Sequence, residues 1–186
     1  MERIIQTTGT AWFMTRPVIY PVEIALTSDK PATNSERMRL SMAMDGVLKG
    51  LLEAGMSAER LRQQPGGDPL QFIRDVSDLR AATAIDCASP TEQGQVHGMV
   101  NKHVSGDLKA EMLDLPPVFG ENPADRAQAM ARATDAATAS AVAIANQVGI
   151  TLGELVGAHE IRADRPAGAS EAERINVRLR CSFEIS

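Results

Sequence analysis

The sequence has few aromatic residues, two cysteines, no cluster of basic residues and no long apolar run. Aromatic residues make up 3% of the 186 residues, with one Trp and one Tyr, so a core has to be built from aliphatic side chains and nine methionines. Such a core is adaptable, because methionine is unbranched and flexible. The chain is 44% hydrophobic and 23% charged, which is typical of a folded globular protein.

The charge balance and the lack of apolar runs exclude two classes of partner. The formal net charge is -5 and no Lys/Arg cluster stands out, whereas a nucleic-acid backbone requires a basic face. No run of about 18 apolar residues predicts a membrane span. The first residues contain no basic segment leading into an apolar stretch, so the sequence as written predicts a cytoplasmic protein, and a periplasmic one if a leader has been removed.

Cys87 and Cys181 are too few and too far apart for a disulfide framework, and neither belongs to a CxxC motif, so we expect two free thiols. Cys181 falls on the apolar side of a predicted strand, where a thiol behaves as a small hydrophobic group. Cys87 is the better candidate for a reactive thiol. No basic residue adjoins it, however, and the neighbouring Asp86 is expected to raise its pKa.

The N-terminal part predicts two strands. Residues Arg3 to Thr8 form a β-prone run that ends at Gly9, and Val18 to Thr27 alternates between two faces. Proline cannot donate a ladder hydrogen bond, so Pro21 is expected to place the second strand at a sheet edge or at a bulge.

A Met-rich helix is predicted next, from a cap at Thr33 or Asn34 to about Ala54, with Gly55 as its left-handed stop. Beyond it the signals are weaker. The weaker segments are a turn over Gln64–Pro69, a short helix over 72–79, a strand over Gln95–Val104 and a helix or strand over Asp107–Leu115.

The C-terminal third predicts a long alanine-rich helix and a β-hairpin. Asn122 can cap the helix, Pro123 suits its first position and Gly149 its end. Strands are predicted over Leu155–Arg162 and Ile175–Ile185. In the last strand the odd-numbered residues are apolar and the even-numbered ones polar, so one face is predicted to be buried and the other to be exposed to solvent.

These elements predict an α+β fold in which antiparallel strands carry helices on one face, with the helix Asn122 to Val148 packed across the sheet. The length suits a single domain over residues 1–186. Its finer division would be into sub-lobes 1–64, 65–121 and 122–186.

The chain resembles the SIMPL-domain family, which includes bacterial periplasmic immunogenic and oxidative-stress-defence proteins. The resemblance lies in the helix Ala127 to Val148, the following segment Gly149-Ile150-Thr151-Leu152-Gly153, and the ending Phe183-Glu184-Ile185. The first strands and the helix to Leu52 are similar too. The resemblance implies α+β lobes that assemble into rings, with a role related to stress. It implies no catalytic residue, cofactor or metal.

Other candidate sites are weaker. His97 and His103 are six residues apart, which fits neither the helical nor the strand spacing of metal ligands, so we expect surface histidines. The pair Gly66-Gly67 opens no phosphate-binding motif and is predicted to be a turn. The neighbouring His159 and Glu160 could supply acid–base groups, but cross-strand pairing with Arg178 and Arg180 is the simpler expectation.

The basic residues of the predicted hairpin form one local basic surface: Arg162, Arg165, Arg178 and Arg180. Its arginines are either solvated or form an intersubunit contact with glutamates of a second copy. We therefore expect a non-enzymatic, self-associating protein that forms a homo-oligomer, with a ring as one form of the assembly and with Arg178, Arg180 and Arg162 as interface candidates. The alternatives are a small-ligand-binding protein with a pocket between the Met-rich helix and the sheet, and a thiol-dependent activity at Cys87.

Overall fold

The computed structural model describes residues 3–62, 79–104, 106–163 and 171–186, and within these ranges the chain is built from antiparallel strands and three α-helices. This confirms the predicted α+β class. In chain order the elements are β1 (Ile4–Met14), β2 (Arg16–Ser28), α1 (Asn34–Glu53), the short helix η1 (Ala58–Arg60), β3 (Arg80–Cys87), α2 (Pro90–His103), β4 (Leu108–Asp114), β5 (Val118–Gly120), α3 (Pro123–Val148), β6 (Leu152–Ala163) and β7 (Arg174–Ile185).

The chain divides into two compact units. Unit 1 joins both ends of the chain, Met1–Val18 and Phe119–Ser186, and unit 2 is the continuous segment Ile19–Val118. The predicted sub-lobes 1–64, 65–121 and 122–186 do not coincide with these units, because the first strand of the chain belongs with the last. None of the described helices has the length and apolar content needed to cross a membrane.

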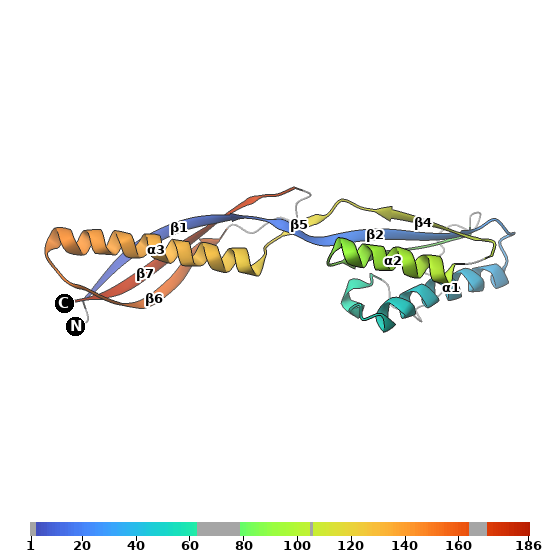
Figure 1. Ribbon diagram of the computed structural model, residues 1–186, viewed down its shortest axis with the longest axis horizontal. Helices are drawn as coiled ribbons and strands as arrows, with labels where there is room; N and C mark the ends of the chain where they lie inside the picture. Colours follow the sequence, from blue (N-terminus) through green and yellow to red (C-terminus); the bar gives the residue numbers. More distant parts are fainter. Residues whose placement is uncertain (1–2, 63–78, 105, 164–170) are drawn as a thin grey trace. The chain divides into compact units, whose positions relative to one another are not determined.

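Unit 1 is a three-stranded antiparallel sheet in the order β1-β7-β6, with α3 on one face (Figure 1). β7 alternates as predicted, and its odd-numbered residues from Ile175 to Phe183 are buried beneath the helix. The helix buries an alanine at every fourth position: Ala129, Ala133, Ala137, Ala141 and Ala145. Because these side chains are so small, the helix can lie very close to the strands.

The closest approach is between α3 and β1. The hydroxyl of Thr7, which is buried, donates to the Ala137 carbonyl oxygen over 2.7 Å. A Cβ atom placed on Gly9 would lie 1.7 Å from the Ala133 carbonyl oxygen. The prediction that Gly9 ends the first strand is therefore wrong. β1 continues to Met14, and Gly9 is needed within it because a helix backbone occupies the space of a side chain.

Unit 2 is a sheet in the order β3-β2-β4 with α1 and α2 on one face (Figure 1). Its core is formed by fully buried aliphatic side chains from β2 and the two helices, including Val22, Ile24, Leu26, Leu40, Met44, Val47, Leu48, Val96 and Val100. The short β5 pairs with β2.

Side-chain caps define where the helices begin. Thr33 accepts from the Glu36 amide at the start of α1, Ser89 accepts from Glu92 at the start of α2, and Asn122 accepts from Ala124 at the start of α3. The left-handed glycines Gly55 and Gly149 follow α1 and α3, as predicted.

Two further predictions, for residues 95–104 and for the strand that contains Pro21, are wrong. Residues 95–103 are not a strand but part of α2, and Val104 is its C-cap, since Ser89 and Pro90 start a helix whose Val96 and Val100 side chains are buried. β2 is not an edge strand, because it pairs with both β3 and β4. Pro21 is tolerated there because the ladder with β4 starts only at Val22, and the Pro21 carbonyl accepts from Leu115. The short helix predicted over 72–79 and the turn over Gln64–Pro69 lie largely outside the described residues.

Candidate functional site

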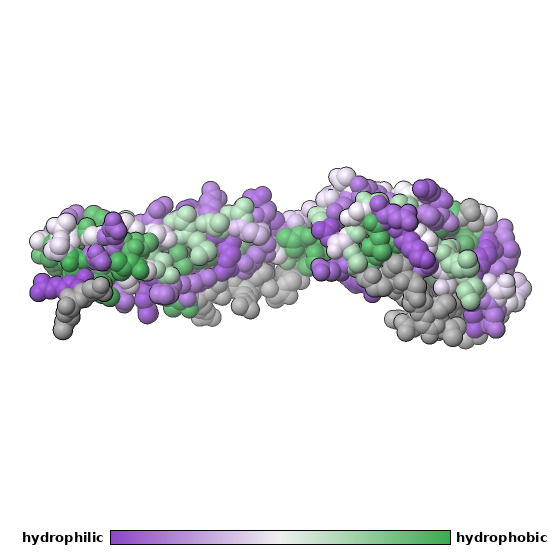
Figure 2. Space-filling model, turned by 90° about the horizontal axis from the view of Figure 1, so that it is seen from below, coloured by the Kyte–Doolittle hydropathy of each residue, from purple (hydrophilic) through white to green (hydrophobic). Residues whose placement is uncertain are grey.

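Unit 1 carries exposed apolar side chains along β6 and along the flank of α3 that faces it, and we call this set the β6 strip. On β6, Leu155, Val156 and Ile161 are 43, 52 and 44% exposed, and on α3, Met130 and Val142 are 36 and 43% exposed. Hydrophobic residues are visible on the surface of this unit in Figure 2. Grouped large apolar side chains of this kind mark interaction surfaces more often than isolated ones do.

α3 lies mainly over β1 and β7 and leaves most of β6 uncovered. The described contacts of the helix with β6 include the ion pair of Arg126 with Glu160, at 2.7 Å. Met130 and Val142 each follow a buried alanine, so they lie on the same flank as Arg126. Among the described residues no strand pairs with the outer edge of β6, which leaves its backbone groups on that edge free for another strand.

Two of the predicted interface arginines, Arg178 and Arg180, lie on the sheet face opposite α3. Arg178 and Arg180 are exposed, and Arg162 stands opposite Arg178 in the β6–β7 register. Within the described part of the chain, no ion pair joins Arg178 or Arg180 to a carboxylate, whereas Arg126 pairs with two. Arg165 lies outside the described residues. The two arginines remain candidates for contact with an acidic group.

The predicted cross-strand pairing of Glu160 is wrong. Register shifts in β6 place Glu160 opposite Leu179, on the helix side of the sheet, where it pairs with Arg126. His159 stands opposite Arg180, on the other face. The neighbours His159 and Glu160 therefore point to opposite faces and do not form one acid–base site.

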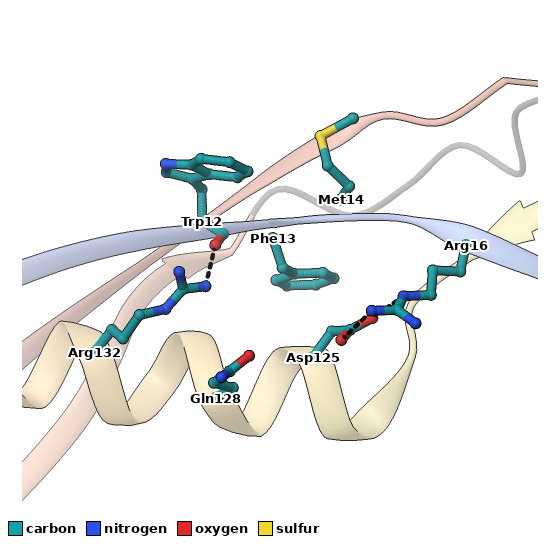
Figure 3. Close-up of a pocket in the computed structure, with 7 residues that line it drawn as sticks. All are labelled: Trp12, Phe13, Met14, Arg16, Asp125, Gln128 and Arg132. Atoms are coloured by element: carbon teal, nitrogen blue, oxygen red, sulfur yellow. Dashed lines mark hydrogen bonds and ion pairs between the residues drawn. The ribbon is translucent and has the colours of Figure 1, made fainter.

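A recess of about 220 Å³ lies between β1 and the first turns of α3 (Figure 3). The Phe13 ring points from β1 toward α3, whereas the side chains of Trp12 and Met14 point away from the helix. The guanidinium of Arg174 lies 4.7 Å from the Trp12 ring centroid. The recess is further lined by Arg16, Asp125, Gln128 and Arg132.

Two arginines bridge β1 to α3 at the recess. The Arg16 Nε lies 2.6 Å from Asp125 Oδ2, and its Nη2 donates to Asp125 Oδ1 over 2.9 Å. Arg132 Nη2 donates to the Trp12 carbonyl oxygen over 2.7 Å. The sequence gives no local signal of this recess, because its two walls are more than a hundred residues apart. Only the helical spacing of Asp125, Gln128 and Arg132 could have indicated a shared face.

Both cysteines are free and buried, as expected. Cys87, at 1% exposure, lies at the end of β3, and burial together with the negative charges of Glu92 and Asp86 raises its pKa from 9.0 to about 11. Burial also raises the pKa of Cys181. A buried thiol that stays protonated at neutral pH is a poor nucleophile, which argues against the thiol-dependent alternative.

The raised pKa predicts a pH dependence of stability. Between about pH 9 and pH 11 the unfolded chain releases the Cys87 proton while the folded chain keeps it, so the free energy of unfolding should fall with rising pH. Urea titrations should show the wild type losing about 2 kcal/mol relative to Cys87→Ala across this window. Parallel curves for the two proteins would show that the thiol is not held protonated.

Two of the three histidines lie in unit 2, each beside a different element. His97 Nε2 lies 2.9 Å from Asp114 Oδ1. His103 lies against α1, where a Cβ on Gly46 would come within 3.2 Å of its Nδ1. Among the described residues no group of three or more His, Cys, Asp or Glu side chains could hold a metal ion. The Gly66-Gly67 pair lies outside those residues.

The space between the Met-rich helix and the sheet, proposed as a ligand pocket, is occupied by core side chains. Met44 of α1 is fully buried against the sheet, together with Val47 and Leu48. The methionines Met38 and Met42 point outward, at 53 and 68% exposure. This packing argues against a ligand site at the interface.

Comparisons with known proteins identify no family. No protein-family model matches the sequence, and no curated protein matches it.

The similar solved structures are distant. The regulatory subunit of aspartate kinase from Thermus flavus is 14% identical, with a TM-score of 0.28, over 94% of this chain and 89% of that one. Aspartate kinase from Clostridium acetobutylicum is 12% identical, with a TM-score of 0.27, over 96% of this chain and 30% of that one. An unknown protein from Galdieria sulphuraria is 10% identical, with a TM-score of 0.26, over 95% and 83%. At such scores these structures assign neither a fold nor a function.

Proposed function

We propose that this chain is a non-enzymatic, self-associating protein of the SIMPL type, and that unit 1 carries the contact between copies. The observation that carries the proposal is the β6 strip, a set of large exposed apolar side chains beside a strand edge with which no described strand pairs. A stress-related role follows only from the sequence resemblance and belongs to the same proposal.

The occupant of this edge is a second copy, because an antiparallel strand edge is complementary to itself. A two-fold axis would place β6 of one chain beside β6 of the other, and the free backbone groups of each edge would pair with those of the other. The pairing would bring the exposed apolar side chains of β6 from the two copies together along the new contact. Burial of these side chains would stabilise the assembly.

Lysine on a strand edge blocks such pairing, because a paired strand would bury the charge. Size-exclusion chromatography with light scattering should therefore give a mass above that of one chain, 19.9 kDa, for the wild type. Val156→Lys combined with Ile161→Lys should shift the mass toward one chain. The matched control is Leu113→Lys, at a side chain of β4 in unit 2 that is 59% exposed, and it should leave the mass unchanged.

The double variant Arg178→Glu with Arg180→Glu tests the opposite face of the same sheet. If only this variant lowers the mass, the contact uses the arginine face and the assignment to β6 is wrong. A wild type that elutes as a monomer at all concentrations would refute self-association altogether.

A further inference from the structure

We propose that the recess between β1 and α3 binds the carboxylate of a small apolar monocarboxylic acid. The recess is distinct from the β6 strip, since it lies along β1, the strand at the other edge of the same sheet. The proposal therefore does not depend on self-association.

The charges at the recess favour an anion. Its lining contains two guanidinium groups, of Arg16 and Arg132, and one carboxylate, of Asp125. Arg16 is matched by Asp125 through two contacts. Arg132 has no carboxylate partner among the described residues, so one positive charge is uncompensated. A carboxylate is the simplest ligand that balances it.

The Arg132 guanidinium is also held in place. One of its nitrogens, Nη2, donates to the Trp12 carbonyl oxygen, so the side chain spans from α3 to β1 (Figure 3). A guanidinium has five N–H donors, and this bond uses one of them. A donor group already fixed by the protein loses less conformational entropy when it binds a ligand.

A second donor lies beside it. Gln128 precedes Arg132 by one helical turn, so the two side chains share a face of α3. The Gln128 amide is exposed and makes no hydrogen bond to a described residue, which leaves its N–H groups available to the second oxygen of a carboxylate.

The size and the apolar wall limit the rest of the ligand. The volume of about 220 Å³ is below the range of roughly 300–1,000 Å³ found for drug-sized ligands, so only a few heavy atoms fit. Phe13 lies between the strand and the helix beneath the recess and offers an apolar contact. A short branched acid such as isovalerate combines a carboxylate for Arg132 and Gln128 with an apolar group small enough for the recess.

The test uses saturation-transfer NMR on the full chain, which works for any assembly size, with isovalerate as the probe. We expect saturable binding with a dissociation constant on the order of millimolar, as for other very small ligands. The neutral isostere isovaleramide should bind about tenfold more weakly or not at all, because it cannot pair with a cation. Equal binding of acid and amide, or no saturable signal from the acid, would overturn the proposal.

Two variants locate the site. Arg132→Gln should weaken isovalerate binding about tenfold or more, whereas Lys102→Gln, which removes one positive charge from an exposed side chain of α2 in unit 2, should change it less than twofold. Gln128→Glu keeps the bridge from Arg132 to Trp12 and places a second carboxylate beside Arg132. It should abolish isovalerate binding while the circular dichroism spectrum stays that of the wild type. Unchanged binding in both Arg132→Gln and Gln128→Glu would place the acid elsewhere.

Discussion

Gly9→Ala should destabilise unit 1 by about 3 kcal/mol or more. The new Cβ would lie 1.7 Å from the Ala133 carbonyl oxygen and 2.8 Å from the Ala137 nitrogen, and these are backbone atoms that cannot rotate away. The helix would have to move off β1, which would weaken the buried hydrogen bond from Thr7 and the packing of the alanine stripe. Chemical denaturation followed by fluorescence of Trp12, the one tryptophan of the sequence, measures the loss within the same unit.

The matched control is Gly157→Ala in β6. There the one described atom within 4 Å of the new Cβ would be His159 Nε2, at 3.8 Å, so we expect a change of less than about 0.5 kcal/mol. If Gly9→Ala proved as mild as Gly157→Ala, α3 would not approach β1 as closely as the structure has it.

Met44→Ala should cost about 2–5 kcal/mol of the stability of unit 2. The Met44 side chain is fully buried in the core of unit 2, and its removal leaves a cavity there. Urea titration followed by circular dichroism measures the loss, because α1 and α2 depend on this core.

Met42→Ala is the matched control, two residues earlier on the same helix. The Met42 side chain is 68% exposed, and alanine is a good helix former, so the change should lie within about 0.5 kcal/mol. A similar loss in both variants would mean that α1 packs on the sheet with a different face.

The sequence was sufficient for elements whose signals are local. The start of α3 at Asn122 and Pro123 depends on the side chains that satisfy the first free amides, and the end at Gly149 on a left-handed residue. β7 was found from alternation alone, because one of its faces is covered by α3 and the other is exposed. Both kinds of signal are set within a few residues.

Elements that depend on distant parts of the chain were not predictable in this way. In the local sequence Gly9 is typical of a strand end. Only its contact with the backbone at Ala133 explains why glycine stands within the strand. In the local sequence Pro21 is typical of an edge strand. Only the length of β4, whose ladder with β2 starts at Val22, explains why proline is tolerated in a central strand. In both cases the deciding contact lies far away in the sequence.

The candidate sites also divide into those set by the local sequence and those set by contacts between distant residues. The alternation of β7 correctly predicted that Arg178 and Arg180 lie on its solvent-exposed face. The β6 strip was missed because register shifts interrupt the alternation of β6, on either side of Leu155 and again after Glu160. The recess was missed because Phe13 and Arg132 come together only in the folded unit.

The division of unit 1 between the two ends of the chain has a consequence for folding during synthesis. Unit 2 is one continuous segment, so it can close its core once the ribosome has released residues 19–118. β1 is made first but pairs with β7, the last strand, across the whole intervening chain. Helix α3 is made before β7, but until β7 emerges β1 has no partner strand, and its apolar residues Phe13 and Ile5 lie on an unpaired segment that is exposed to aggregation.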